Sequence, residues 1–140
     1  MDKKDVLETV EKVVLSQYIN QIRSGKIAFA NLATHFKNIV NHGVYFVFDQ
    51  NDTLVYVGQS GGYGLSKKWG LKDRISQHQS SGNSGAQNLG VSIQTIKSSY
   101  SFSYIVLDTP DKILEMEKFF IGIFSRILQF NKHHKVKIFT

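Results

Sequence analysis

The chain has 140 residues, of which 41% are hydrophobic and 20% charged, with a formal net charge of +6. This composition is typical of a single globular domain. The absence of cysteine excludes disulfides, thiolate metal sites and a cysteine nucleophile, and it fits a reducing, cytoplasmic compartment. No apolar run approaches the roughly 18 residues that a membrane span needs, so no membrane association is expected. The mixed charges of residues 1–14 do not predict a signal peptide.

The positive charge lies in one part of the chain. Residues 1–60 hold six Lys and Arg against six Asp and Glu, whereas residues 61–140 hold eleven against five. An excess of this kind suits a polyanionic partner, and nucleic acid is the commonest. A basic surface kept for solubility is the alternative, and charge alone does not decide between the two.

Residues 1–40 are dominated by helical periodicity. Apolar residues recur at helical spacing over 3–22, and a shorter helix is predicted over 27–40. Neither segment carries an obvious chemical group. We expect both to form an N-terminal helical layer that packs on the rest of the fold.

The apolar period then changes to two, which predicts a β-hairpin over residues 43–59. One strand begins Gly-Val-Tyr, ending at Tyr45, and the other ends Tyr-Val-Gly, starting at Tyr56. An even-numbered loop would place Tyr45 opposite Tyr56 and Gly43 opposite Gly58, with both phenols on one face. An odd-numbered loop would place the phenols on opposite faces. Tyrosine is also simply a favourable strand residue.

A basic, aromatic loop, GGYGLSKKWG, follows at residues 61–70. It lacks the Gly-Lys-Ser/Thr ending of a nucleotide phosphate loop, so a nucleoside triphosphate site is not supported. A short helix is predicted over 71–78, where Arg74 and His78 share a face. A guanidinium is well shaped to bind phosphate, although an ordinary amphipathic surface helix explains the same pair. Residues 79–92 are rich in Ser, Gly and Asn and predict a loop.

A third strand is predicted over residues 101–107, and Thr109-Pro110-Asp111 predicts the start of a long helix that ends near residue 128. Glu117 falls on the apolar stripe of that helix, which also contains Ile113, Phe120, Ile121 and Phe124.

A carboxylate on a core-facing stripe needs a cation, a metal or a proton. The alternative to a functional role for Glu117 is a buried ion pair with Arg74 or Lys112. Asn131 lies shortly after the predicted end of the helix and, taken alone, is typical of a helix cap.

The order of these features is more specific than any one of them. Gly-Val-Tyr, Tyr-Val-Gly, Arg, His, Glu and Asn follow one another between Gly43 and Asn131. In this order the chain resembles the GIY-YIG nuclease superfamily over about two thirds of its length. The resemblance implies an α+β fold with a small three-stranded antiparallel sheet flanked by helices. It also implies a single domain over 1–140, with a nuclease core over 41–131 and a basic tail over 132–140.

The family's activity is metal-dependent hydrolysis of DNA phosphodiester bonds, with Mg²⁺ or Mn²⁺ as cofactor. By position, the resemblance implies that Glu117 holds the metal, Arg74 binds the scissile phosphate and Asn131 braces the site. One carboxylate is enough, because Mg²⁺ keeps waters and phosphate oxygens as its other ligands. Gly43 and Gly58 would be structural glycines that allow close approach.

The general base is left open among Tyr45, Tyr56 and His78. A tyrosine base would need a lower pKa than its usual value of about 10, for which Arg74, a lysine or the metal would have to supply positive charge.

Basic residues outside the reacting set are candidates for DNA contacts, together with Trp69. The loop over 60–69 is longer than the family's usual link, so a flexible insertion is the alternative, and the family's frequent proline before the Asn is missing. The predicted DNA contacts are Lys67, Lys68, Lys72, Lys132 and Lys135.

A non-cleaving nucleic-acid-binding module of the same fold is the main alternative function, and a structural protein with an accidental motif is a third. A nuclease with one active site cuts both strands as a homodimer or in two events. Residues 1–40 would then serve as a dimer interface or as a core layer.

Overall fold

The centre of the fold is the predicted hairpin of two apolar strands, β2 (Gly43–Phe48) and β3 (Leu54–Ser60). The computed structural model, which describes residues 2–80, 89–129 and 137–138, places β4 (Ser101–Val106) antiparallel on the other side of β2. All six residues of β2 are buried, as expected for a central strand with helices on both faces of its sheet. The predicted outer bounds of the hairpin and the predicted bounds of the third strand are confirmed to within one residue.

The predicted three-stranded sheet is incomplete, because the sheet has five strands in the order β1-β4-β2-β3-β5. The extra strands lie at its edges. β1 (Ile27–Ala28) pairs antiparallel with β4, and β5 (Lys137–Ile138) pairs parallel with β3. Two-residue strands are too short to show an alternating pattern in the sequence. The α+β class is confirmed.

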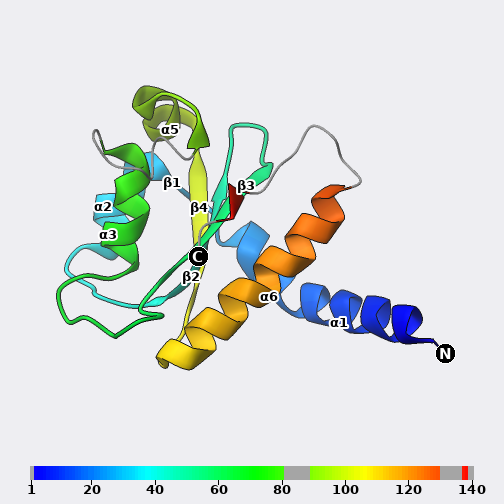
Figure 1. Cartoon of the computed structure of the whole chain (residues 1–140). Helices are drawn as coiled ribbons and strands as arrows, with labels where there is room; N and C mark the ends of the chain where they lie inside the picture. The colour runs from blue at the N-terminus through cyan, green and yellow to red at the C-terminus, as the bar shows by residue number, and fades with distance from the viewer. Residues whose placement is uncertain (1, 81–88, 130–136, 139–140) are drawn as a thin grey trace.

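Helices lie on both sides of the sheet (Figure 1). The helices α1 (Lys3–Ser24) and α6 (Pro110–Gln129) lie on one side, and α2 (Leu32–Phe36), α3 (Leu71–Ser76) and α5 (Ile93–Ser99) on the other. Short 3-10 turns, η1 (Phe29–Asn31) and η2 (Gln77–Gln79), precede α2 and follow α3. None of the helices in the described part of the chain is long and apolar enough to cross a membrane.

Two helix predictions need correction. The helix predicted over 27–40 is instead β1, η1 and the short α2, which ends where Lys37 adopts a positive φ of 47°. The helix α5 was not predicted, because it follows a polar segment and only Ile96 within it is buried.

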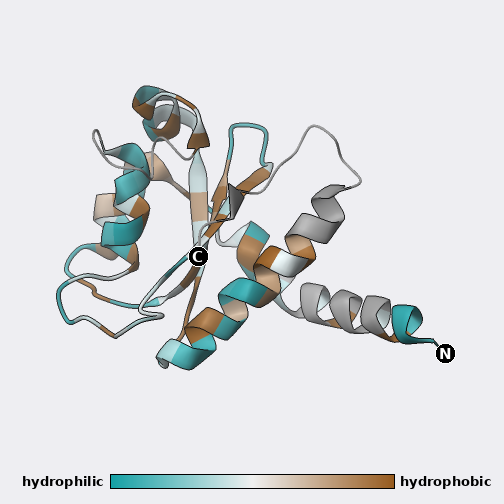
Figure 2. Cartoon of the chain, viewed as in Figure 1, coloured by the Kyte–Doolittle hydropathy of each residue, from teal (hydrophilic) through white to brown (hydrophobic). Residues whose placement is uncertain are grey.

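Alternation along the strands divides the apolar residues between two cores. Tyr45 and Val47 face α2, α3 and α5, whereas Val44, Phe46 and Phe48 face α1 and α6. Figure 2 shows hydrophobic residues along the strands and in bands on α6. The sheet therefore separates two layers of helices, and side chains from different layers can meet only at its edge or past a missing side chain.

The C-terminal turns of α1 pack in the core that lies on the α1 and α6 side of the sheet. Ile22 is 3% exposed, and Tyr18 packs edge-on against Phe120 with ring centroids 5.6 Å apart. The N-terminal turns extend away from the sheet (Figure 1). The predicted packing of this helix on the fold is confirmed for its last turns.

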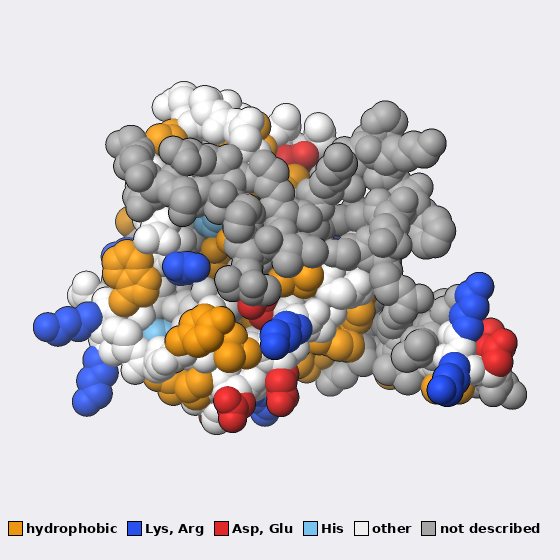
Figure 3. Space-filling view, viewed as in Figure 1, with side chains coloured by type: hydrophobic (Ala, Val, Ile, Leu, Met, Phe, Trp, Pro, Cys, Tyr) orange, Lys and Arg blue, Asp and Glu red, His pale blue; other side chains and the backbone are white. Residues whose placement is uncertain are grey.

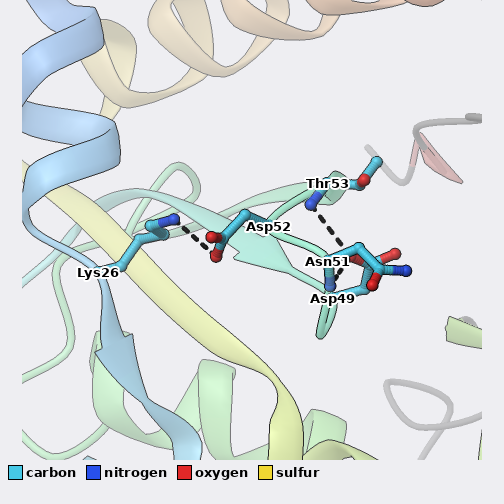
Figure 4. Close-up of polar contacts among 5 residues, drawn as sticks. All are labelled: Lys26, Asp49, Asn51, Asp52 and Thr53. Atoms are coloured by element: carbon cyan, nitrogen blue, oxygen red, sulfur yellow. Dashed lines mark hydrogen bonds and ion pairs between the residues drawn. The ribbon is translucent and has the colours of Figure 1, made fainter.

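The hairpin turn is held by the carboxylate of Asp49. Its Oδ1 accepts hydrogen bonds from the backbone N–H groups of Asn51 at 2.8 Å and Thr53 at 3.0 Å (Figure 4). Asp52 adopts a positive φ of 59°, and its carboxylate forms an ion pair of 2.7 Å with Lys26. Short polar side chains tolerate this backbone conformation, which explains the polar turn sequence.

The pairing of β2 with β3 corrects the predicted register. Tyr45 lies opposite Gly58, Val47 opposite Tyr56, and Gly43 opposite Ser60. The pairs that an even-numbered loop would give, Tyr45 with Tyr56 and Gly43 with Gly58, therefore differ from the observed register by two residues.

The shift has an identifiable cause in the turn and in a bulge. Residues 49–53 separate the strands, and this odd number alone would place the two phenols on opposite faces. An irregularity beside Val47 and Phe48 leaves Val55 as an extra residue in β3. One extra residue reverses the parity, so Tyr45 and Tyr56 lie on the same face after all.

Candidate active site

A pocket of about 360 Å³ lies among β3, the loop that follows it, α3 and α6. Its lining includes Tyr56 and Gly58 of β3, Arg74 of α3 and Glu117 of α6. These residues come from three elements and from both sides of the sheet. The pocket thus brings together four residues that were selected from the sequence.

Gly58 allows the Tyr45 phenol to approach the backbone of β3. A Cβ added at Gly58 would lie 2.5 Å from both Cζ and Oη of Tyr45, well inside van der Waals contact. Because the two residues face each other across the hairpin, the phenol lies over the glycine backbone. The expectation that Gly58 is a structural glycine is supported by this contact.

Three aromatic side chains form a buried cluster behind the pocket. Tyr45 Oη and His78 Nε2 are hydrogen bonded at 2.8 Å. The Tyr56 ring centroid lies 5.8 Å from that of Tyr45 and 4.6 Å from that of His78. All three side chains are at most 4% exposed. Of the three, Tyr56 lines the pocket.

Burial is the main influence on the acidity of both tyrosines. It raises the pKa of Tyr45 well above 10, assisted by the neighbouring Tyr56, and it also raises the pKa of Tyr56. The positive charge of Arg74 lowers both pKa values but does not overcome burial. Both hydroxyls are therefore protonated at neutral pH, which suits them to donate hydrogen bonds.

Arg74 is exposed at the rim of the pocket, while its helix is firmly anchored. Leu71 and Ile75, on the buried side of α3, are both 0% exposed. The helix begins after Gly70, whose N–H donates to Asp73 Oδ2 at 2.9 Å. The Arg74 side chain is thus exposed at the pocket on a helix whose other face is buried.

Glu117 is the buried carboxylate of the site, with 2% of its surface exposed. Within the described ranges it forms no hydrogen bond or ion pair, so the alternative of a direct pair with Arg74 or Lys112 is not supported. Burial raises its pKa from 4.5 to about 7, against the positive charges of Arg74 and Lys118. Among the described residues, no ion pair neutralises this carboxylate.

A divalent cation fits this arrangement chemically. Glu117 lines the pocket, so its oxygens face a space in which an ion can keep its waters. The described residues contain no group of three or more His, Asp or Glu placed to hold a metal. Mg²⁺ and Mn²⁺ accept one carboxylate with water and phosphate oxygens as the other ligands, and one carboxylate is what the pocket offers.

His42, which was not predicted, braces the pocket loop. It is 8% exposed, and its Nε2 lies 2.8 Å from the Ser66 carbonyl oxygen, which can only accept. In the neutral ring Nδ1 therefore accepts from the Ser60 hydroxyl, at 3.0 Å. Gly61, with φ of 93°, leaves room for the His42 ring. The partners are 18 and 24 residues away in sequence, so no local pattern reveals them.

The loop has further internal hydrogen bonds. Ser66 Oγ accepts from the backbone N–H groups of Lys68 and Trp69, both at 3.1 Å, and Gln59 Oε1 accepts from the N–H of Gly62 at 2.8 Å. These bonds fix the backbone on which the exposed loop side chains stand.

The other predicted residues lie away from the pocket lining or outside the described residues. Gly43 has φ of 152°, and a Cβ there would lie 1.9 Å from the Ile105 carbonyl oxygen, which explains a glycine at this position. Lys67 and Lys68 are exposed beside the pocket. Lys72 Nζ instead donates to the Lys37 carbonyl oxygen at 3.2 Å. The predicted Asn131, Lys132 and Lys135 lie outside the described residues.

Comparison of the chain with protein-family models, curated proteins and solved structures finds no match. The chemistry of the pocket therefore rests on its own residues.

Proposed function

We propose that this chain is a metal-dependent DNA endonuclease of the GIY-YIG type. The main observation in support is that Tyr56, Arg74 and Glu117 line one pocket. Tyr45 and His78 are hydrogen bonded to each other directly behind it. Their order in the sequence resembles that superfamily, and their residue types suit phosphodiester hydrolysis. The basic second half of the chain suits a DNA substrate.

Arg74 is the proposed phosphate-binding group. A phosphodiester carries a negative charge that grows toward the transition state, so a positioned guanidinium stabilises that state. Arg74 combines an exposed side chain with a lining position in the pocket. A bound phosphate would thus lie between Arg74 and the wall formed by Tyr56 and Glu117.

Glu117 is the proposed metal ligand. A bound Mg²⁺ or Mn²⁺ would neutralise charge on the phosphate and make a coordinated water more acidic. A cation there would also replace the proton that burial favours on this carboxylate.

The aromatic cluster is proposed to orient the reacting groups. The Tyr56 hydroxyl is the one at the pocket wall, and its raised pKa suits a neutral donor to a water or a phosphate oxygen. Tyr45 and His78 position that hydroxyl from behind. Hydrolysis then breaks one P–O bond, adds the water oxygen to phosphorus and leaves a hydroxyl on the departing sugar.

Cleavage of supercoiled plasmid by wild type with Mg²⁺, Mn²⁺ or EDTA tests this function. We expect relaxed and linear products with metal and none in EDTA. Arg74→Ala should lower the rate about 10²–10³-fold, the typical cost of losing one transition-state donor. Lys97→Ala, which removes an exposed positive charge from α5, should cleave as wild type does. DNA binding without cutting under every metal condition would favour the non-cleaving module.

A further inference from the structure

The pocket has a second part that the proposed hydrolysis does not use. Tyr63 and Trp69, both in the loop between β3 and α3, line the pocket together with Arg74 and Glu117. Tyr63 is 82% exposed and Trp69 is 47% exposed. Exposed large apolar side chains that gather at one site are typical of ligand-binding grooves.

These two aromatics stand on a backbone that is held in place. The backbone N–H of Trp69 donates to Ser66 Oγ, and the Ser66 carbonyl oxygen accepts from His42 Nε2. Gly70, the next residue, packs so closely that a Cβ would lie 2.5 Å from the Asn41 carbonyl oxygen. The loop thus presents its aromatics from fixed anchor points, which limits the entropy lost when a ligand binds.

Basic residues accompany the aromatic ones. Lys67 and Lys68 are exposed immediately before Trp69. On the face shown in Figure 3, hydrophobic side chains lie beside Lys and Arg side chains over the loop between β3 and α3. Aromatic groups that accept bases, interleaved with cations that follow the backbone, are typical of sites for single-stranded nucleic acid.

We infer that Tyr63 and Trp69 form a base-stacking subsite, and that the preferred substrate is DNA whose bases are unstacked beside the scissile phosphate. This inference rests on the proposed function, and it specifies the substrate. In paired B-form DNA the base faces are covered by their neighbours, so exposed rings can stack on a base only where pairing is interrupted. A strand with its phosphate at Arg74 would place an adjacent base on these rings, because both groups line one pocket.

Trp69 is the only tryptophan in the chain, so its fluorescence reports directly on this subsite. The probes are a single-stranded oligonucleotide, the same sequence as a full duplex, and the single strand with a run of abasic residues. Titrations in EDTA measure binding without cleavage. We expect the single strand to quench Trp69 and to bind at least tenfold more tightly than the abasic strand, because stacking contributes strongly for each base.

Variants separate stacking from phosphate binding. Tyr63→Ala and Trp69→Ala should each weaken single-strand binding about tenfold by fluorescence anisotropy, whereas Trp69→Phe should retain most of it. Leu65→Ala is the matched control, since Leu65 is 43% exposed in the same loop but does not line the pocket. Thermal unfolding of each variant checks that the fold is unchanged.

Equal affinity for single-stranded, duplex and abasic DNA, with both alanine variants binding as wild type does, would overturn the inference. If the wild-type protein gave this binding result but still cut plasmid in the presence of metal, the subsite would be disproved and the proposed function would not. A wild type that neither bound nor cut any of these DNAs would overturn both.

Discussion

Tyr45 and Gly58 face each other across the hairpin, and the Tyr45 phenol occupies the space that a side chain at Gly58 would need. This relationship explains why a glycine follows the second tyrosine by two residues. It also places the buried hydrogen bond between Tyr45 and His78 beside the pocket wall.

Gly58→Ala should destabilise the protein by about 1–3 kcal/mol, the usual cost of adding a methyl group to a filled space. The new Cβ would lie 2.5 Å from the Tyr45 ring, so ring and strand must shift. Urea denaturation measures the change. Gly122→Ala is the control, because nothing lies within 4 Å of its Cβ position on α6, and it should stabilise by about 0.5–1 kcal/mol. Equal effects of the two substitutions would contradict the packing described.

Glu117 should make stability depend on pH in metal-free buffer. Its pKa in the folded state is raised to about 7, so the fold retains a proton that the unfolded chain releases from about pH 4.5 upward. The stabilisation is complete below the unfolded pKa and is lost as the pH rises to about 7.

The difference in unfolding free energy between wild type and Glu117→Gln isolates this effect. It should change by about 1–3 kcal/mol between about pH 4.5 and 7.5 in favour of the variant, given 1.36 kcal/mol per pKa unit and partial access through the pocket. Glu115→Gln, at an exposed position on the same helix, is the control and should show little trend. A pH-independent difference for Glu117→Gln would disprove the raised pKa.

Removal of the hydroxyl should affect cleavage rate and stability differently at the two tyrosines. Tyr56→Phe removes the hydroxyl of a residue that lines the pocket, and we expect it to have the larger effect on activity, with a cleavage rate at least 10²-fold slower. Tyr45→Phe removes a buried hydrogen bond to His78 and should lose about 1–2 kcal/mol of stability in addition to activity. Parallel denaturation and cleavage assays compare them. A stability loss confined to Tyr56→Phe would reverse this assignment.

His42→Ala should loosen the pocket loop. It removes the hydrogen bonds to Ser60 and to the Ser66 carbonyl, and we expect a loss of about 1–3 kcal/mol. The emission of Trp69 should also change, because its loop anchor is gone. Ser60→Ala removes one of the two bonds and should have a smaller effect on both readouts. Unchanged emission in His42→Ala would show that the loop is anchored elsewhere.

The sequence predicts those parts of the fold that have a strong period. Alternation locates the three long strands, and the helical stripe identifies Glu117 as a buried carboxylate, which is 2% exposed. The short edge strands have too few residues to alternate, and α5 has one buried residue. These elements form through tertiary contacts, which a local pattern does not encode.

The register and the loop brace depend on the same kind of distant information. The bulge at Val55 determines that both phenols share a face. The residue types around it do not predict the bulge. His42 acquires its role only when the chain returns Ser60 and Ser66 to it. By contrast, Tyr56, Gly58, Arg74 and Glu117 were candidates from the sequence alone, and all four line the pocket.

The most direct test of the proposed nuclease activity compares wild type with Glu117→Gln on supercoiled plasmid, with Mg²⁺, Mn²⁺ or EDTA and with Glu115→Gln as the control. The proposed function predicts metal-dependent cutting by wild type and Glu115→Gln, and none by Glu117→Gln. The same cations should raise the melting temperature of wild type but not of Glu117→Gln, since a ligand stabilises the state that binds it. Metal-dependent cutting that survives intact in Glu117→Gln, or no cutting by wild type on any DNA, would contradict it.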